Sequence, residues 1–384
     1  MIYFNSDYTQ GAHPSILEAL CETNLIPTPG YGEDPYCRKA ARLIRTAAVG
    51  REGEAPCRPQ PNGPEGRPLT WYDPEKAGIH FLVGGTQANL TVISAALRPH
   101  QGVLSADSGH IHVHETGAVE ATGHKVLTVP ETPENRRAGK ISAQAAERLC
   151  RAQKEDEAFE HFVQPKMIYL SHPTENGTLY TREELLAFRQ LCDDYGLYLF
   201  LDGARLSYGL AAAGSDVTLP FLARICDAFY IGGTKTGALF GEAVVVNHPA
   251  IRQDFRYIMK QKGGMLAKGR LLGLQFLGLF QEDRYLKIAK QANDLAAQIR
   301  EACIDSGFPL LCHTTTNQQF PILPNALLDS LKEHYSYSSW EKIDDTHTAI
   351  RLCTSWATTQ EEVDALISDL KKLRHRTNCA IGHP

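Results

Sequence analysis

The sequence lacks the features that mark membrane, secreted and nucleic-acid-binding proteins. No stretch of its 384 residues is long and apolar enough to span a bilayer, and Met1 to Asp7 has neither the basic start nor the apolar run of a secretory signal. A formal charge of −5 gives no basic footprint for nucleic acid or an anionic membrane. We therefore expect a cytoplasmic protein that acts on a small molecule.

Closely spaced cysteines are also missing. The nearest two of the ten cysteines, Cys303 and Cys312, are nine positions apart, so no C-x-x-C metal or redox motif exists. Scattered thiols fit a reducing compartment. With 43% hydrophobic residues, a chain of this length is expected to form one large domain and a smaller one, because single cores stop growing near roughly 250–300 residues.

Apolar runs typical of strands alternate with helical patterns from about residue 79. This alternation predicts an α/β fold, with a mostly parallel sheet covered by helices on both faces. Between two of the strands, Thr181 and Glu184 form a capping box that begins a helix, and Gly196 ends it. The predicted strands are 79–83, 103–105, 125–129, 167–170, 197–201, 228–231 and 243–246.

The pattern changes near residue 250. Residues 251–304 are helical with few turn signals, and the elements that follow indicate a small α+β domain. Residues 50–76 are rich in proline, glycine and charge, so we expect a surface excursion or mobile loop there. The late elements are two strands over 319–323 and 348–352 and a helix from about 359 to 373.

Lys235 and Asp202 carry the strongest chemical signal. Lys235 has small and apolar neighbours, and loss of hydration lowers the pKa of such an amine until it can form a Schiff base. Asp202 follows an apolar strand, at the end where open α/β sheets bind ligands. Pyridoxal phosphate needs such an amine and a carboxylate for its pyridine nitrogen. The structural alternatives are a solvated lysine and an Asx turn beside a paired Arg205.

Gly84, Gly85 and Thr86 directly follow a predicted strand and open a predicted helix. The exposed N–H groups of a helix start form an anion site, which glycine lets a ligand approach closely, and Thr86 adds a hydroxyl donor. A phosphate group fits such a site. A tight strand-to-helix turn capped by the threonine is the structural alternative.

His110, His112 and His114 would share one face of an extended segment, so three imidazoles could bind zinc. No other ligand of the usual spacing lies nearby, and we favour one ring stacked on a cofactor and no metal site. Arg351 lies in a predicted strand and could bind an amino-acid carboxylate through two parallel hydrogen bonds. A structural pair with an acidic residue is the alternative for Arg351.

In their order along the chain, these motifs resemble the low-specificity L-threonine aldolases, pyridoxal phosphate enzymes related to the aromatic amino-acid β-eliminating lyases. The resemblance extends nearly to the last helix. It implies an aspartate aminotransferase-like fold (fold type I), with a mostly parallel sheet domain and a smaller C-terminal α+β domain. The matching segments are 5–7 with Gly11 and Pro14, 31–35, 85–89, 109–110 with 114–118, 202–205, 234–235, and Arg351 with 354–356.

The resemblance assigns each site residue a role. Lys235 would carry the cofactor as a Schiff base, Asp202 would pair with its pyridine nitrogen, and His110 would stack on its ring. Gly85 and Thr86 would hold the phosphate. The substrate carboxylate is assigned to Ser6, Arg205 and Arg351, and the catalytic base is left among His110, His161 and an activated water.

Two departures from the family pattern bear on these roles. Glu175 lies where the family has a histidine, in a stretch that only approximates its E-N-T-H-N-G motif. Leu266 lies where an arginine is typical. The residues left to contact phosphate from a neighbouring subunit are Arg256, Lys260, Lys262 and Lys268.

The resemblance further implies a lyase that cleaves L-threonine or L-allo-threonine, a β-hydroxy-α-amino acid, to glycine and acetaldehyde. β-Elimination, transamination and a binding protein without catalysis are the alternatives. The expected assembly is a homodimer or homotetramer with shared active sites. The expected domains are an N-terminal arm that contributes to the active site (1–35), a large cofactor-binding domain (36–250), and linker helices with a small C-terminal domain (251–384).

Overall fold

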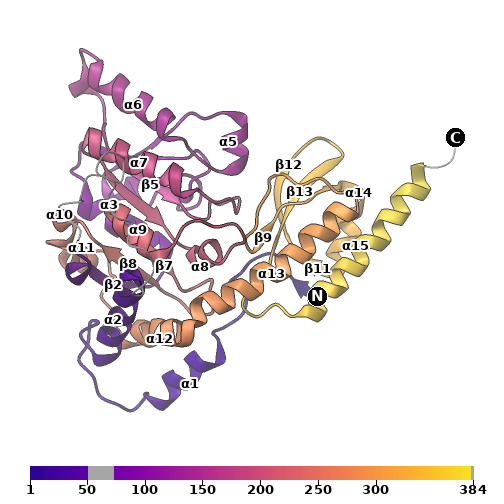
Figure 1. The fold of residues 1–384 in the computed structure, drawn as a ribbon, viewed down its shortest axis with the longest axis horizontal. Coiled ribbons are helices and arrows are strands. Elements are labelled where there is room, and N and C mark those ends of the chain that lie inside the picture. The colour runs from indigo at the N-terminus through magenta and orange to yellow at the C-terminus, as the bar shows by residue number, and fades with distance from the viewer. Residues whose placement is uncertain (51–72, 382–384) are drawn as a thin grey trace.

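The computed structural model describes residues 1–50 and 73–381, so most of the predicted surface excursion, residues 51–72, lies outside the described residues. A seven-stranded sheet, in the order β2-β8-β7-β6-β5-β3-β4, forms the centre of the fold (Figure 1). Strands β4, β3, β5, β6 and β7 are parallel neighbours, whereas β8 is antiparallel to both β7 and β2. The strands are β2 (Gly78–Leu82), β3 (Gln101–Ser105), β4 (Lys125–Thr128), β5 (Gln164–Ser171), β6 (Tyr198–Asp202), β7 (Ala228–Gly232) and β8 (Glu242–Val246).

Each face of this sheet has its own hydrophobic core. Along β5, Ile168 and Leu170 belong to one core, whereas Met167 and Tyr169 belong to the other, because successive side chains of a strand point to opposite faces. Helices cover both cores, and the predicted α/β fold is confirmed. The first core includes residues of α2 (Pro35–Val49), α6 (Ala143–Glu155), α7 (Arg182–Tyr195), α9 (Leu219–Ile225) and α12 (Arg270–Phe280), and the second includes residues of α3 (Gly85–Ala96), α10 (Pro249–Arg252) and α11 (Phe255–Gln261).

All seven predicted strands are present, and most of their bounds agree to within one or two residues. The predicted capping box is also confirmed. The Thr181 side chain accepts from the Glu184 N–H, and the Glu184 side chain accepts from the Thr181 N–H. Gly196 ends α7 in the left-handed region, with φ of 63°. This helix returns the chain from β5 to the start of β6.

The C-terminal part contains a smaller sheet and a third hydrophobic core, beyond the long helix α13 (Arg284–Asp305) (Figure 1). The predicted helical run over residues 251–304 is confirmed in part. Residues 262–269 between α11 and α12 are not helical, and a left-handed turn at Glu282 and Asp283 separates α12 from α13. The last helix, α15 (Gln360–Ile381), is longer than predicted. The smaller elements are β9 (Gln318–Gln319), β10 (Ile322–Pro324), α14 (Asn325–Lys332), β11 (Tyr335–Ser336), β12 (Ser338–Lys342) and β13 (His347–Cys353).

The N-terminal segment connects the smaller sheet with the larger one. Strand β1 (Ile2–Tyr3) pairs in parallel with β11, and the Phe4 carbonyl accepts from the Cys353 N–H. Farther along, the His13 N–H donates to the carbonyl of Gly237, in the loop that follows β7. Helix α1 (Pro14–Glu22) then packs on α12. The predicted domain boundaries stay predictions. Within residues 1–50 and 73–381, we find no helix with the length and apolarity to cross a membrane.

Candidate active site

A pocket of about 310 Å³ opens at the carboxyl ends of β5, β6 and β7, beside the start of α3. Parallel strands present their carboxyl ends at the same edge of a sheet, so side chains distant in sequence meet there. Six residues predicted from the sequence line this pocket: Gly85, Thr86, His110, Asp202, Arg205 and Lys235.

Two glycines let the ends of β6 and β7 approach each other. A Cβ atom on Gly203 would lie 1.9 Å from the carbonyl oxygen of Tyr230, and one on Gly232 would lie 2.3 Å from that of Ala204. No side chain fits at either position. This close approach places the Asp202 carboxylate and the loop with Lys235 in one pocket.

Asp202 is buried and held by several donors. Its Oδ2 accepts from the Tyr169 hydroxyl at 2.5 Å and from Asn89 Nδ2 at 3.2 Å, and its Oδ1 accepts from the Ala204 N–H at 2.9 Å. Burial alone raises the pKa of Asp202, but the charge of His110 and these hydrogen bonds outweigh burial and lower it. The residue is therefore an anion suited to pair with a cationic ring nitrogen.

Lys235 lies after β7, and its half-buried side chain lines the pocket. Burial and the charge of Arg205 lower the pKa of Lys235, although Asp7, Asp202 and Glu242 act in the opposite direction. Among the described residues, its amine has no hydrogen-bond or ion-pair partner. Such an amine is more readily neutral, and so nucleophilic, than a solvated one.

His110 is the first residue of α4 (His110–Val113), and a short network connects it with Asp202. Its Nδ1 donates to Glu115 Oε1 at 2.8 Å, and the same oxygen accepts from Asn89 Nδ2 at 2.7 Å. Burial alone lowers the pKa of His110, but the Glu115 hydrogen bond and the charges of Asp202 and Glu115 outweigh it and raise the pKa. Asn89 thus joins both carboxylates and fixes the ring.

The start of α3 forms one end of the pocket. Its N-cap is Gly84, with no side-chain capping hydrogen bond, so no capping side chain covers the N–H groups of the first turn. A Cβ atom on Gly85 would lie 3.0 Å from the Tyr230 hydroxyl, whereas one on Gly84 would meet nothing within 4 Å. An oxyanion can therefore approach this backbone, beside Thr86.

These groups fit pyridoxal phosphate. Lys235 offers an amine without a partner, Asp202 an anion for the pyridine nitrogen, and His110 a fixed ring. Gly85 and Thr86, at the uncapped start of α3, offer donors for the phosphate.

Arg205 lines the pocket with its guanidinium already paired. Its Nε donates to Asp7 Oδ2 at 2.7 Å and its Nη2 to Asp7 Oδ1 at 2.9 Å. Burial alone raises the pKa of Asp7, but the charges of Arg205 and Lys235, with hydrogen bonds from Arg205 and Asn317, lower it to about 2. The alternative from the sequence, an Arg205 paired with a carboxylate, is what the structure contains.

Ser6 and Arg351 lie beside this pair but do not line the pocket with Lys235. Arg351 Nη2 donates to the carbonyl of Asn5 at 3.0 Å, its guanidinium lies 5.0 Å from the centre of the Trp340 ring, and its buried Nε has no partner. The Ser6 hydroxyl is buried without a partner too. The segment from Asn5 to Asp7 thus contacts both arginines, with Ser6 between them.

The structure does not bring His161 into the pocket. His161 is exposed in a 3-10 turn before the amino end of β5, whereas Ser171 at the other end lines the pocket. The two ends of this strand are roughly 25 Å apart at about 3.3 Å per residue. The loose alignment that suggested His161 placed it at the wrong edge of the sheet.

The histidine run is not extended. His110 and His114 lie on a short helix, with ring centroids 5.5 Å apart, and His112 is exposed. The prediction that alternation in an extended segment brings the three imidazoles together is therefore wrong. In the part of the chain that the structure describes, we find no group of three potential metal ligands.

Sequence reasoning left two carboxyl groups of this pocket without a role. Glu242 begins β8, and its Oε1 accepts from the Thr234 hydroxyl at 3.0 Å, while its buried Oε2 has no partner. Burial raises the pKa of Glu242 to about 8, in spite of Lys235. Glu175 lies in the turn after β5, and the sequence had marked it only as a departure from the family.

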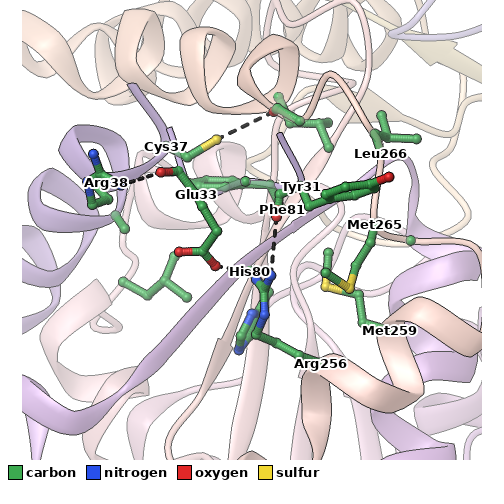
Figure 2. Close-up of a pocket in the computed structure, with 16 residues that line it drawn as sticks. Tyr31, Glu33, Cys37, Arg38, His80, Phe81, Arg256, Met259, Met265 and Leu266 are labelled. Atoms are coloured by element: carbon green, nitrogen blue, oxygen red, sulfur yellow. Dashed lines mark hydrogen bonds and ion pairs between the residues drawn. The ribbon is translucent and has the colours of Figure 1, made fainter. Parts of the chain in front are cut away.

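Residues 31–33 of the 31–35 turn line a separate cavity of about 240 Å³ (Figure 2). Arg256 donates to Glu33 Oε1 at 3.0 Å and to the Tyr31 carbonyl at 3.3 Å, and the Lys260 amine lies 4.6 Å from the centre of the Tyr31 ring. Neither cation lines the pocket of Lys235 in the same chain.

The sequence and the fold both have relatives among characterised proteins. The sequence model of the family described as β-eliminating lyase matches residues 4–325. The low specificity L-threonine aldolase of Pseudomonas aeruginosa is 28% identical over 372 residues, which are 96% of each chain. The Saccharomyces cerevisiae protein of that name is 27% identical over 257 residues, 66% of this chain and 63% of its own.

Among solved structures, the threonine aldolase of Leishmania major superposes with a TM-score of 0.87 at 38% identity, and the match covers 97% of this chain and 100% of the other. A variant of Thermus thermophilus aspartate aminotransferase gives a TM-score of 0.66 at 14% identity, over 97% of this chain and 91% of its own. This second match concerns the fold alone. It agrees with the aspartate aminotransferase-like architecture expected from the motifs.

Proposed function

The chain belongs to the β-eliminating lyase family, among its threonine aldolase members, and we propose that it cleaves the Cα–Cβ bond of a β-hydroxy-α-amino acid. Glycine and an aldehyde are the products, and with L-threonine the aldehyde is acetaldehyde. Family membership also confirms the lyase class and the predicted cofactor, pyridoxal phosphate.

One observation supports this function most strongly: an amine without a partner and a buried anion line the same pocket, at Lys235 and Asp202. Attached to Lys235, pyridoxal phosphate supplies an electron-withdrawing ring that accepts the electron pair of the bond that breaks. Asp202 keeps the ring nitrogen protonated and so maintains this electron demand. His110, whose ring is fixed by Glu115, would pack against the cofactor.

Substrate orientation decides which bond of Cα breaks. We assign the substrate carboxylate to Arg205, Ser6 and Arg351, because the segment that bears Ser6 contacts both guanidiniums. Asp7 fixes the plane of Arg205 and leaves Nη1 without a hydrogen bond to any described residue. This geometry would hold the Cα–Cβ bond perpendicular to the ring.

A product assay with L-threonine tests the reaction. We expect acetaldehyde and glycine in equal amounts, whereas β-elimination or transamination would release ammonia or a keto acid. Lys235→Ala should abolish both the cleavage and the visible absorbance of the lysine-bound cofactor. A matched control is Lys166→Ala, because Lys166 is half-buried like Lys235 but lies far from the pocket, near the amino end of β5. Full turnover in the Lys235 variant would show that the amine has been assigned wrongly.

We also propose an assembly of at least two chains. The described cations that line the pocket are His110, Lys235 and Arg205, and two of them are already paired, His110 with Glu115 and Arg205 with Asp7. A basic residue from a second chain would balance the charge of a phosphate dianion. The candidates are Arg256, on the separate cavity (Figure 2), Lys260, beside Tyr31, and Lys262 and Lys268. Light scattering after gel filtration tests the assembly, and a monomer of 42.4 kDa with full activity would contradict it. The cytoplasmic location stays a prediction, which cell fractionation can test.

A further inference from the structure

Glu175 and Glu242 form no ion pair with any described residue, although both line the pocket. By contrast, Asp7 is paired with Arg205, and Glu115 with His110. An unpaired carboxyl group in a reactive pocket is available to exchange protons. Of the two, Glu175 is the one whose free oxygen is not buried against protein.

Two donors fix one oxygen of Glu175. Its Oε1 accepts from the Ser171 hydroxyl at 2.7 Å and from the His110 N–H at 2.9 Å, whereas Oε2 has no hydrogen bond within the described chain. The Oε2 atom is also not buried against protein. The carboxyl group is thus fixed in direction, with one oxygen free to meet a ligand.

The backbone around Glu175 is held as well. The Thr174 hydroxyl donates to the carbonyl of Ala138 at 2.8 Å, and Asn176 Nδ2 donates to that of Arg137 at 2.7 Å. Gln318 Nε2 donates to the carbonyl of Glu175 itself at 3.4 Å. The turn is therefore bound from both domains, as a precisely placed side chain requires.

Glu175 also lies between two cavities. Besides the cofactor pocket, it lines a neighbouring cavity of about 550 Å³, together with His114 and Trp340. A substrate attached near Lys235 would extend its β-carbon past Glu175, because the neighbouring cavity offers space for the β-substituent. Glu175 thus lies where the cofactor pocket meets the space available to the β-substituent.

We propose that Glu175 is the catalytic residue that accepts the proton of the substrate's β-hydroxyl group. This inference rests on the proposed aldol cleavage. The O–H bond breaks, its electron pair forms the aldehyde carbonyl, and the pair of the broken Cα–Cβ bond passes to the Cα side. Cα then takes up a proton, and Glu175 returns its own to solvent, so glycine and the aldehyde together contain all atoms of the substrate.

The surroundings of Glu175 make it a stronger base than a solvated carboxylate. Burial raises its pKa, the charge of Asp202 adds to this, and the hydrogen bonds from Ser171 and His110 oppose it. Other titratable groups surround it on every element packed against it. In the cofactor pocket they are Tyr8, Arg205, Tyr230, Lys235 and Glu242. Elsewhere they are Tyr169 on β5, Tyr180 after the turn, His114 near the end of α4, Asp107 and Glu131 in loops, Arg136 and Arg137 on α5 (Pro133–Ala138), and Glu341 on β12.

Glu175→Gln in the cofactor-loaded enzyme tests the assignment, because the amide keeps the shape and removes the base. We expect kcat for L-threonine to fall at least about 100-fold, while the dissociation constant of glycine, read from the change in cofactor absorbance, stays within about twofold. Glycine has no β-hydroxyl group, so its binding does not depend on proton transfer from that group and reports only whether the site is intact. Glu134→Gln is the matched control, since Glu134 is an exposed carboxylate on α5.

The pH profile gives a second measurement. In the wild type, kcat/KM rises as Glu175 ionises with increasing pH, and Glu175→Gln should lose this rise, whereas Glu175→Asp should keep it with a reduced kcat. The assignment is overturned if the Gln variant cleaves threonine within about threefold of wild type, or if it loses glycine affinity to the same extent as kcat. A wild type that binds glycine but cleaves no β-hydroxy amino acid would instead refute the proposed function.

Discussion

Two buried arginine–aspartate pairs lie at opposite edges of the central sheet. At the amino edge, Arg189 of α7 donates to Asp227 Oδ2 at 2.8 Å, and the same oxygen accepts from the Leu199 N–H at 2.6 Å. At the carboxyl edge, Arg205 donates to both oxygens of Asp7. The chemistry of the two pairs is the same, but only the second lines a pocket.

The difference between the edges lies in what surrounds each pair. Asp227 also ties strands together, because its carbonyl accepts from the N–H groups of Asn247 and His248. Around Arg205, an amine and two carboxyl groups have no ionic partner in the described chain. The amino edge is thus built for stability, whereas the carboxyl edge retains groups whose charge is open to change. The burial of an ion pair does not by itself distinguish the two edges of the sheet.

Arg189→Met should cause the largest effect on folding. It leaves the Asp227 carboxylate buried without its cation, which costs about 3 to 5 kcal/mol. Urea unfolding measures this loss, and the protein that remains folded should keep its kcat/KM within about twofold. A variant that stays stable but loses activity would show that the pair at the amino edge serves activity and not stability.

Asp202→Asn should instead lower activity and leave stability nearly unchanged. The amide keeps most hydrogen bonds but cannot hold a ring nitrogen protonated, so kcat/KM should fall about 100- to 1,000-fold, as when one preorganised electrostatic group is removed. The thermal midpoint should stay within about 2 °C of wild type. Steady-state kinetics and thermal melting on the same sample provide the check, and an activity within tenfold of wild type would contradict the assigned role.

Glu242→Gln should change how stability depends on pH. A folded-state pKa of about 8, above the ordinary value of 4.5, means that this group favours folding at low pH, and that the benefit disappears as pH rises through about 8. The amide removes that dependence, so the variant should be more stable than wild type at pH 9, by on the order of 2 kcal/mol. Urea unfolding at pH 6 and pH 9 measures the difference, and parallel pH curves would show that Glu242 is ionised in the native state.

His161→Gln should have the smallest effect. The ring is exposed at the amino edge and contacts no part of the pocket, so kcat/KM and stability should stay within about twofold and 0.5 kcal/mol of wild type. A large loss of cleavage would restore His161 as a base and require that its segment move toward the pocket. The same kinetic and unfolding assays apply.

The sequence predicted what depends on local pattern. Apolar runs identified all seven strands, and the small residues around Lys235 together with the strand before Asp202 identified the centre of the site. It could not predict partners that only folding brings together, such as Asp7 and Arg205, which are 198 positions apart. Glu242 went unnoticed because a single charge at the start of an apolar run looks like a strand boundary.

The short N-terminal segment couples the two domains mechanically. The Phe4 N–H donates to the Ser336 carbonyl of β11, the Phe4 carbonyl accepts from the Cys353 N–H of β13, and the Asn5 carbonyl accepts from Arg351. Asp7 is paired with Arg205 in the pocket, so only Ser6 lies between these attachments. One residue extends at most about 3.6 Å. A rotation of the smaller domain that exceeds this tether must pull Asp7 away from the guanidinium. Rotation of the smaller domain and separation of Asp7 from Arg205 are therefore one motion.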